Sequence, residues 1–302
     1  MTHRPISVEY KSLEIILPVL PVEDIYIGIQ NISIQNIRSH FQMPTLDPSW
    51  EPEGPLVAPA PSILPSIDSV IDGQHVSLIP LLESHAAELY NNVAGLQNAH
   101  LYKYLFGGPF SDVESFVSYI KLLCREPTVF LPYAICSKSP VASSSTAPPH
   151  SPGEKHSGNL TGIICLLNIV PSHRSIEIGH VLFGPLLQRS TAATEACYIL
   201  MKHCFEDLNY LRVEWKANNF NEPSKRAALR LGFVFEGIFR KHMVVRGRGR
   251  DTAWYSVTDE EWAGGVKAAL EDWLSDDNFD GQRRQRTRLE EVRKGTVGGS
   301  AR

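Results

Sequence analysis

The chain of 302 residues has few cysteines, and the five that it has are scattered. Cys124, Cys136, Cys165, Cys197 and Cys204 include no C-x-x-C pair, so neither a disulfide framework nor a zinc ladder is indicated. The eleven histidines are equally dispersed and form no H-E-x-x-H motif, which leaves a metal site without support. We therefore expect reduced, buried thiols and no bound metal.

The sequence also lacks a long apolar run and an excess of positive charge. No stretch approaches the roughly 20 apolar residues that a membrane helix needs. The segment 13–22 is interrupted by Glu14, Pro18 and Pro21 and has no strongly basic flank, so it does not read as a signal peptide. The formal net charge of -4 argues against attraction of the whole protein to nucleic acid or to anionic membrane. We expect a cytoplasmic protein, with a nuclear location left open.

Composition predicts a folded domain over residues 67–274 with appendages at both ends. Prolines crowd residues 44–65 and favour an extended linker, because proline fixes its own backbone and pushes its predecessor out of helix. Residues 1–66 are therefore read as an N-terminal extension, whose first 43 residues form an arm, an extra strand pair or an irregular segment. The Ser/Pro/Gly/Ala-rich residues 137–158 predict a disordered insertion. Residues 275–302, rich in arginine from 283 onward, predict a basic disordered tail.

Within the predicted domain, strand and helix patterns alternate. Apolar and β-branched periodicity predicts strands over residues 75–79, 130–136, 160–170, 175–183, 211–217, 233–240 and 252–258. One helix is expected to begin at Ser111, with Glu114 completing a capping box, and another covers residues 222–231 and ends at Gly232. Such alternation predicts an α/β or α+β domain around a mixed sheet.

Three segments of this domain read GQHVSLIPLLESHAAELY, IEIGHVLFGPLLQRSTAATEA and RVEWKANNFNEPSKRAALRLGFVFEGIFR. In the last one, Asn221 and Ser224 open a helix that ends in Ala-x-x-Leu-Gly-Phe, residues 228–233. Together, over about two thirds of the chain, they resemble the GNAT superfamily of N-acetyltransferases, and in particular its branch of ribosomal-protein N-terminal alanine acetyltransferases. The resemblance implies the GNAT fold, in which about six to seven strands form a mixed central sheet flanked by helices. Its fourth and fifth strands, here residues 175–183 and 211–217, splay apart.

The resemblance also implies acetyl-CoA as a co-substrate. In the family, its pyrophosphate lies on the loop and first helical turn after the fourth strand, where unpaired N–H groups and the helix dipole attract anions. In this chain that segment comprises Gln188, Arg189, Ser190, Thr191, Ala192, Ala193 and Thr194, and Asn221 is expected to face the pantetheine arm. Thr191 stands where the family pattern has its first glycine, which lets a phosphate approach the backbone closely. Whether the threonine weakens CoA binding stays open.

By resemblance, a primary amine attacks the thioester directly, which requires a path for its proton, a stabilised oxyanion and optionally an acid for the thiolate. Glu177 is the candidate base, acting through water, and Ser224 is the candidate donor to the leaving sulfur. Asn221 and Ser224 also fit a helix cap, and the two roles are compatible. His180 would face away from Glu177 on a regular strand, so we interpret it as structural unless a bulge intervenes.

Several conspicuous features have plainer interpretations. The aromatic residues Trp215, Phe220, Phe235 and Tyr255 are read as core rather than as a substrate pocket. The run from Arg246 to Asp251 is read as a solvated hairpin tip rather than as a phosphate-binding patch.

Three functions stay open: an enzyme that acetylates a small amine, an enzyme that acts on a protein N-terminus, and a catalytically impaired CoA-binding or protein-interaction module. The expected partner is an amine substrate, small molecule or peptide N-terminus, with no membrane and no nucleic acid. The protein is expected to be a monomer or a homodimer.

Overall fold

The computed structural model describes residues 54–57, 61–125, 130–138, 158–282 and 284–298. The chain divides into two compact units, Met1–Ala58 and Pro59–Arg302, and nearly all of the described residues belong to the second. Most of the predicted N-terminal extension, and nearly all of the predicted insertion over residues 137–158, lie outside the described residues. Both remain predictions.

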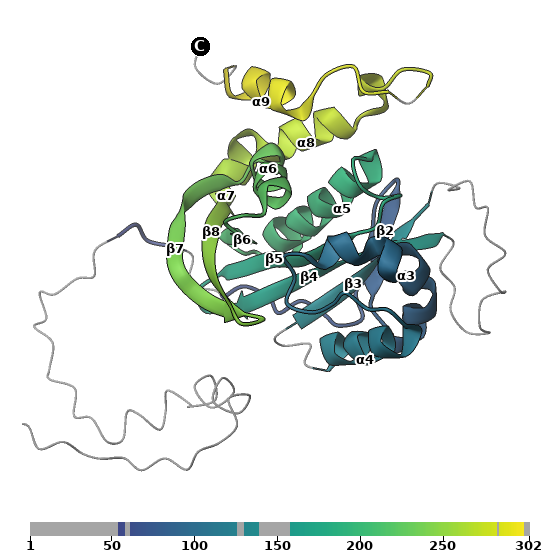
Figure 1. The fold of residues 1–302 in the computed structure, drawn as a ribbon. Helices are drawn as coiled ribbons and strands as arrows, with labels where there is room; N and C mark the ends of the chain where they lie inside the picture. The colour runs from purple at the N-terminus through teal and green to yellow at the C-terminus, as the bar shows by residue number, and fades with distance from the viewer. Residues whose placement is uncertain (1–53, 58–60, 126–129, 139–157, 283, 299–302) are drawn as a thin grey trace, which may run out of the picture. The chain divides into compact units, whose positions relative to one another are not determined.

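Most strands appear where the sequence patterns place them, but β7 and β8 extend further towards their shared turn than the predicted strands 233–240 and 252–258, and β1 was not predicted. The strands are β1 (Ile71–Asp72), β2 (Val76–Pro80), β3 (Phe130–Ser137), β4 (Asn159–Val170), β5 (Ser175–Phe183), β6 (Arg212–Asn218), β7 (Val234–Val245) and β8 (Arg248–Thr258). The described strands form one sheet in the order β1-β2-β3-β4-β5-β6-β8-β7 (Figure 1). Neighbours are antiparallel except β5 and β6, which are parallel. The predicted mixed sheet is therefore confirmed, with eight described strands instead of six to seven.

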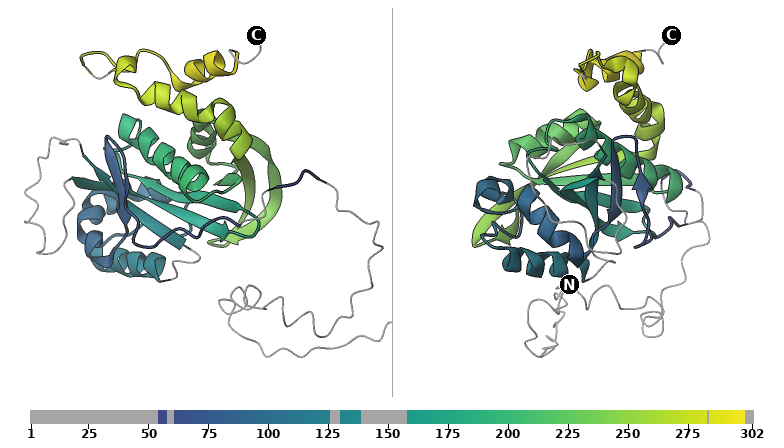
Figure 2. Two further views of the ribbon diagram at one scale, coloured as in Figure 1. Left: turned by 180° about the vertical axis from the view of Figure 1, so that it is seen from behind. Right: turned by 90° about the vertical axis from the view of Figure 1, so that its right-hand side faces the viewer.

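Helices cover both faces of this sheet (Figures 1 and 2). One face carries α3 (Ala86–Val93) and α4 (Val113–Cys124), together with the short turns η1 (Glu83–His85) and η2 (Leu96–Tyr102). The other carries α5 (Thr191–Lys202), which runs into a π-helical turn η3 (His203–Asp207), and α6 (Glu222–Leu231). Towards the C-terminus follow α7 (Asp259–Glu261), η4 (Trp262–Val266), α8 (Lys267–Leu274), η5 (Asp276–Asn278) and α9 (Leu289–Gly298).

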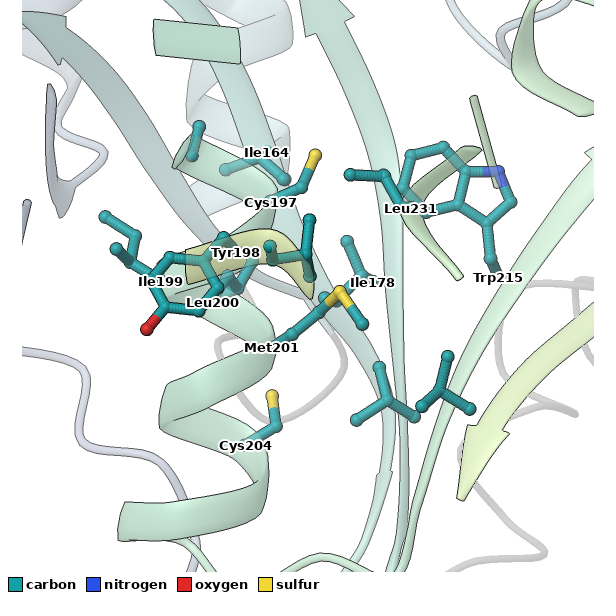
Figure 3. Close-up of a cluster of buried hydrophobic side chains, with 14 of the residues drawn as sticks. Ile164, Ile178, Cys197, Tyr198, Ile199, Leu200, Met201, Cys204, Trp215 and Leu231 are labelled. Carbon is teal, nitrogen blue, oxygen red and sulfur yellow. The ribbon is translucent and has the colours of Figure 1, made fainter. Parts of the chain in front are cut away.

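Each face of the sheet has its own hydrophobic core. The period-two alternation of β5 and β6 buries Ile176, Ile178, Val213 and Trp215 on the α5 side. Figure 3 shows the α5 side chains, Cys197 and Met201 among them, packed in the same cluster. The second core lies under α3 and α4 and includes Leu89, Phe116, Ile120, Ile163 and Cys165. The alternate side chains on β5 and β6 face the α4 side, and these carry the polar groups described below.

Short polar residues and one glycine set the helix ends. The carboxylate of Asp112 accepts a hydrogen bond from Ser115 N over 2.8 Å and caps α4, so the expectation that Ser111 caps this helix is wrong. At α6, Asn221 Oδ1 accepts from Ser224 N over 3.3 Å. That helix ends at Gly232, whose φ of 109° is the left-handed conformation that favours glycine. The predicted C-terminal cap is confirmed.

The first hairpin is tied to α5 by one buried carboxylate. Glu195, 5% exposed, accepts hydrogen bonds from the backbone N–H groups of Gln74, His75 and Val76, over 2.8, 2.6 and 2.9 Å. A Cβ on Gly73 would lie 2.8 Å from the carboxyl carbon of Glu195, so a side chain at this position would displace that carboxylate. Charge-assisted bonds of this kind are about twice as strong as neutral ones, and three of them fix the turn against the helix.

The end of the proline-rich segment also belongs to the second unit. The N–H of Ser62 donates to the carbonyl of Pro171 over 3.2 Å, and that of Ile63 donates to Leu208 over 2.9 Å. The Ser62 hydroxyl donates to the carbonyl of Asn209 over 2.8 Å. The compact unit thus begins at Pro59, ahead of the predicted boundary at residue 67.

The C-terminal residues differ from the predicted disordered tail as far as residue 298. Phe279 and Leu289 are buried against the α5-side core. The amide of Asn278 donates to the carbonyls of Trp273 and Thr287, and the Arg293 guanidinium donates to Leu229 O over 2.6 Å. Arginine-rich composition misled the prediction because two apolar side chains are enough to dock this segment.

Candidate active site

The parallel strands β5 and β6 pair over three residues only. The paired positions are Ser175 with Arg212, Ile176 with Val213, and Glu177 with Glu214. Beyond them, each strand keeps its other neighbour, β4 for β5 and β8 for β6, while the facing edges have no partner strand among the described residues. Unpaired backbone groups at such an edge can pair with an extended ligand. The predicted splay of these two strands is confirmed.

The N-terminus of α5 follows β5 and presents backbone donors. Ser190 is its N-cap: its hydroxyl accepts from Ala193 N over 3.0 Å and donates to Leu187 O over 2.6 Å. In the part of the chain that the structure describes, no acceptor is recorded for the N–H groups of Thr191 and Ala192. With the helix dipole, these two groups form an anion-attracting end.

The remaining residues of the predicted cofactor loop shape it rather than present donors. The side chain of Gln188 folds back and donates to Phe183 O over 2.8 Å. Arg189 adopts a φ of 60°, the left-handed bend of the loop. The hydroxyl of Thr194 accepts from Arg230 over 3.0 Å and so joins α5 to α6. The structure therefore brings all seven predicted residues into one loop and turn, while their roles in CoA binding stay a prediction.

Ser224 lies in the first turn of α6 beside the end of β6. Its hydroxyl oxygen accepts from the indole N–H of Trp215 over 3.0 Å. Trp215 is 4% exposed and is the first residue of β6 beyond the pairing with β5. Since a hydroxyl has one proton and two lone pairs, this bond leaves the Ser224 O–H as a donor. The capping role belongs to Asn221, and the Ser224 side chain is engaged by Trp215 instead.

Glu177 lies at the point where the strands part and faces the α4 side, because its neighbours Ile176 and Ile178 pack on the α5 side. It is 5% exposed and accepts from Asn168 Nδ2 over 2.5 Å and from Lys216 Nζ over 2.8 Å. Burial raises the pKa of the Glu177 carboxyl, and Lys216 opposes that rise. A buried carboxylate with a raised pKa is suited to accept a proton, so the base role of Glu177 remains a prediction with a physical rationale.

A bulge places His180 on the same face as Glu177. The pairing of β4 with β5 changes register between Cys165, opposite Gly179, and Ile163, opposite Leu182. His180 takes a φ of 49° there, and its Nε2 lies 2.7 Å from the hydroxyl oxygen of Tyr119 on α4. Burial lowers the pKa of His180 to about 4, so the imidazole is neutral at physiological pH.

The neutral state of His180 predicts a pH-dependent stability. Histidine titrates near pH 6.5 in the unfolded chain and near 4 in the folded one, so the unfolded state binds more protons between these values. The contribution of His180 to the free energy of unfolding is therefore fully present above pH 6.5. It decreases, by up to about 3 kcal/mol, as the pH drops towards 4. His180→Asn, which tolerates a positive φ, should flatten this slope in urea titrations between pH 7 and 4. His100→Asn at an exposed position is the matched control, and an unchanged slope in His180→Asn would refute the assignment.

The β7–β8 hairpin tip folds back over the connection between α3 and α4. The Arg246 guanidinium donates to the carbonyls of Tyr102, Lys103 and Gly108 over 2.9, 3.1 and 2.9 Å. Arg250 is 8% exposed, and its guanidinium lies 5.0 Å from the ring centroid of Phe106. The interpretation of residues 246–251 as a solvated tip is therefore wrong for Arg250, whereas Arg246 is exposed as predicted, with its guanidinium bound to these carbonyls.

Sequence reasoning missed two contributors to this face. Lys216 joins Glu177 to Glu214 through ion pairs of 2.8 and 2.9 Å and lies 4.0 Å from the ring centroid of Trp254. The alternation Arg212-Glu214-Lys216 along β6 could have predicted this network. Three charged side chains on one face of a central strand need oppositely charged partners nearby, because unpaired charges are costly to bury. Tyr119 gave no signal, because its contact with His180 joins residues 61 apart in sequence.

The aromatic residues of the sequence analysis divide between core and surface. Trp215 and Tyr255 are buried in the α5-side core as expected. Phe220 and Phe235 are exposed, by 72% and 48%, so the core interpretation is wrong for them. Among the described residues, no group of three or more His, Cys, Asp or Glu side chains could hold a metal ion, and no helix is long and apolar enough to span a bilayer.

The parallel strands β5 and β6 part after three paired residues, and the N-terminus of α5 presents free N–H groups beside the gap. This arrangement suits an extended ligand that carries phosphate. Comparison with known proteins agrees with this. Residues 75–234, more than half of the chain, match the family profile described as Acetyltransferase (GNAT) domain. The chain belongs to the GNAT acetyltransferase family.

Solved structures of the family resemble the chain over most of its described part. A GCN5-related N-acetyltransferase from Brucella melitensis is 36% identical, with a TM-score of 0.69, over 78% of this chain and 98% of that one. A GNAT-family acetyltransferase from Chromobacterium violaceum, so described provisionally, is 34% identical with a TM-score of 0.58, over 72% and 100% of the two chains. The names of these two proteins give their family and do not say which molecule accepts the acetyl group.

A curated relative is the Bacillus subtilis protein YdaF, named provisionally as a ribosomal N-acetyltransferase. It is 34% identical over 112 residues, which are 37% of this chain and 61% of YdaF. The chain thus spans less than two thirds of the length of this relative.

Proposed function

We propose that the chain transfers the acetyl group of acetyl-CoA to a primary amine by direct attack of the amine on the thioester. The single observation that carries this proposal is the three-residue pairing of β5 with β6 beside the free N–H groups of Thr191 and Ala192. Together they offer a strand edge for the pantetheine amides and a helix N-terminus for the pyrophosphate. Acetyl-CoA supplies the activated acetyl group.

The residues around the splay have complementary roles in this proposal. Glu177, held by Lys216 and Asn168, takes the proton of the amine through a water molecule as nitrogen bonds to the carbonyl carbon. As the carbon–sulfur bond breaks, the Ser224 hydroxyl, oriented by Trp215, donates a hydrogen bond to the departing thiolate, which takes its proton from solvent. These roles rest on the position of each group beside the splay.

The threonine at position 191 is compatible with a phosphate-binding helix end. Thr191 lies inside the first turn of α5, and the positive φ of the loop falls at Arg189. A β-branched residue is therefore unstrained at position 191, and its backbone N–H remains available. This observation favours an active enzyme over a catalytically impaired CoA-binding module.

Two measurements test the proposal. Calorimetry should show binding of acetyl-CoA to the purified chain, and a thiol-release assay should show acetyl transfer to at least one amine or N-terminal peptide. Binding without release against a broad panel would favour the CoA-binding module, and absence of binding would refute the proposal.

The hydroxyl of Ser224 has a separate test. Ser224→Ala should lower turnover about tenfold, less than loss of a general acid usually costs, because a thiolate is a good leaving group. It should also reduce the free energy of unfolding by about 1–2 kcal/mol, since the buried indole N–H of Trp215 loses its acceptor. Asp112→Ala, which removes the cap of α4, is the control for an equal loss of stability alone. Full turnover in Ser224→Ala would remove Ser224 from the reaction.

A further inference from the structure

The guanidinium of Arg250 is buried and has no ion-pair partner among the described residues. It is 8% exposed, donates from Nε to the hydroxyl of Thr252 over 3.2 Å and lies over the ring of Phe106. Among the described residues, no carboxylate forms an ion pair with it. A guanidinium has five N–H donors, and in the part of the chain that the structure describes its two terminal nitrogens have no protein acceptor. Burying an unpaired charge is costly, which makes this position conspicuous.

The nearby carboxylates are already engaged elsewhere. Arg212 binds Glu214 over 2.8 Å and Glu236 over 2.5 Å, and Lys216 binds Glu177 and Glu214. Arg250 is within electrostatic reach of Glu177 without pairing with it. Trp254, on the same face of β8, adds a buried indole N–H that has no acceptor within the described ranges. Among the described residues, this face of the sheet therefore has hydrogen-bond donors without acceptors, on Arg250 and Trp254, and its carboxylates are all paired.

Arg250 is on the same face of the sheet as Glu177. On β8, Ala253, Tyr255 and Val257 pack in the α5-side core, so Arg250, Thr252 and Trp254 face the other side. Trp254 lies under Lys216, which in turn binds Glu177. The unpaired guanidinium and the candidate base thus belong to one continuous polar surface.

We propose that Arg250 binds an anionic group of the acceptor, and that the acceptor is a small molecule carrying both a primary amine and a carboxylate or phosphate. This inference rests on the proposed acetyl transfer. Glu177, Glu214 and Glu236 are each paired with Arg212 or Lys216, so a second anionic group has to come from a ligand if Arg250 is to be paired. A ligand with both charges pairs the guanidinium, whereas a simple amine leaves it unpaired.

The cover over Arg250 favours a compact acceptor over a polypeptide. Phe106 belongs to the connection between α3 and α4, which Arg246 holds to the hairpin tip through three hydrogen bonds. This contact places a fixed segment over the guanidinium. A peptide chain leaving the site past Arg250 would have to displace it.

Matched pairs of amines test the inference in the thiol-release assay. Each pair holds one amino acid and its carboxamide, or one aminoalkyl phosphate and its amino alcohol, with varied spacing between the charges. The anionic member of at least one pair should show a KM about tenfold lower. Peptides with an amidated C-terminus and an acidic first residue distinguish a side-chain carboxylate from that of a free amino acid, and preference for them would overturn the small-molecule assignment.

Substitutions at Arg250 separate binding from a structural role. Arg250→Met should abolish the preference for the anionic member, Arg250→Lys should keep part of it, and Arg248→Met, at an exposed position of the same strand, should keep all of it. A merely structural Arg250 would change both members of a pair alike, which would overturn the inference.

The remaining outcomes concern the two proposals separately. If carboxamides react as well as acids in the wild type, the inference fails while acetyl transfer stands. If no amine reacts although acetyl-CoA binds, calorimetry of the N-acetylated amino acids and phosphates with CoA decides, and absence of binding overturns the inference. Absence of acetyl-CoA binding would refute the proposed function itself.

Discussion

Glu177→Gln is expected to lower turnover by about a hundredfold or more, the usual contribution of a general base, while acetyl-CoA affinity stays unchanged. Glutamine fits the same space, so the change removes mainly the charge that Lys216 and the amine proton require. In the wild type, the rate should rise with pH through the raised pKa of Glu177, because a base must be ionised to accept a proton. The variant should lose this acidic limb of the pH–rate profile, measured as kcat with saturating acetyl-CoA.

The neighbouring Glu214 provides a matched control. It shares Lys216 with Glu177 and binds Arg212 as well, so Glu214→Gln disturbs the same ion-pair network. It should lower turnover far less and keep the acidic limb. Equal losses in the two variants would mean that the network as a whole matters rather than Glu177 as a base, and an unchanged profile in Glu177→Gln would exclude that role.

Thr191→Pro should weaken acetyl-CoA binding by about 2 kcal/mol, or roughly thirtyfold in Kd, because hydrogen bonds to charged groups are worth that much. Proline is favoured at the first position of a helix, and Ser190 before it has an extended backbone with ψ near 164°, which a following proline prefers. The substitution therefore removes one N–H group while α5 stays formed. Calorimetry gives the affinity, and circular dichroism verifies the helix.

Two other variants delimit this result. Thr191→Gly keeps the N–H and should bind acetyl-CoA as well as the wild type or better, since it restores the family's glycine. Ala193→Pro is less informative, because the Ala193 N–H already serves the Ser190 cap and its loss would also destabilise the helix start. Unchanged affinity in Thr191→Pro would place the pyrophosphate elsewhere.

Local signals made much of the fold predictable. Asn221 and Gly232 mark the two ends of α6 because capping depends on residues within one turn. The same locality explains the error at α4: Ser111 and Asp112 are both good caps, and Ser111 donates its hydroxyl to the Asp112 carboxylate instead. The splay of β5 and β6 was predicted from the resemblance to the GNAT family and not from a local signal, and the three-residue pairing agrees with it.

The parts of the site that escaped prediction depend on contacts between distant segments. The bulge at His180 has no sequence signal, because the positive φ falls on a histidine and not on a glycine. Arg246 reaches carbonyl groups 138 to 144 residues earlier in the chain, so composition could describe its charge and not its partners. Arg250 belongs to the same charged run, which we interpreted as solvated. It is buried because Phe106, from a distant segment of the chain, lies against it.

The carboxylate of Glu195 also constrains the order of folding. Its three acceptor bonds join residues 119 to 121 apart in sequence, and long loops close slowly because their closure entropy is lost before the contact forms. During synthesis, the turn at Gln74–Val76 leaves the ribosome well before α5, so its N–H groups bond to water until that helix exists. The β1–β2 hairpin is therefore completed late, and these first described strands take their final place only after α5 has folded.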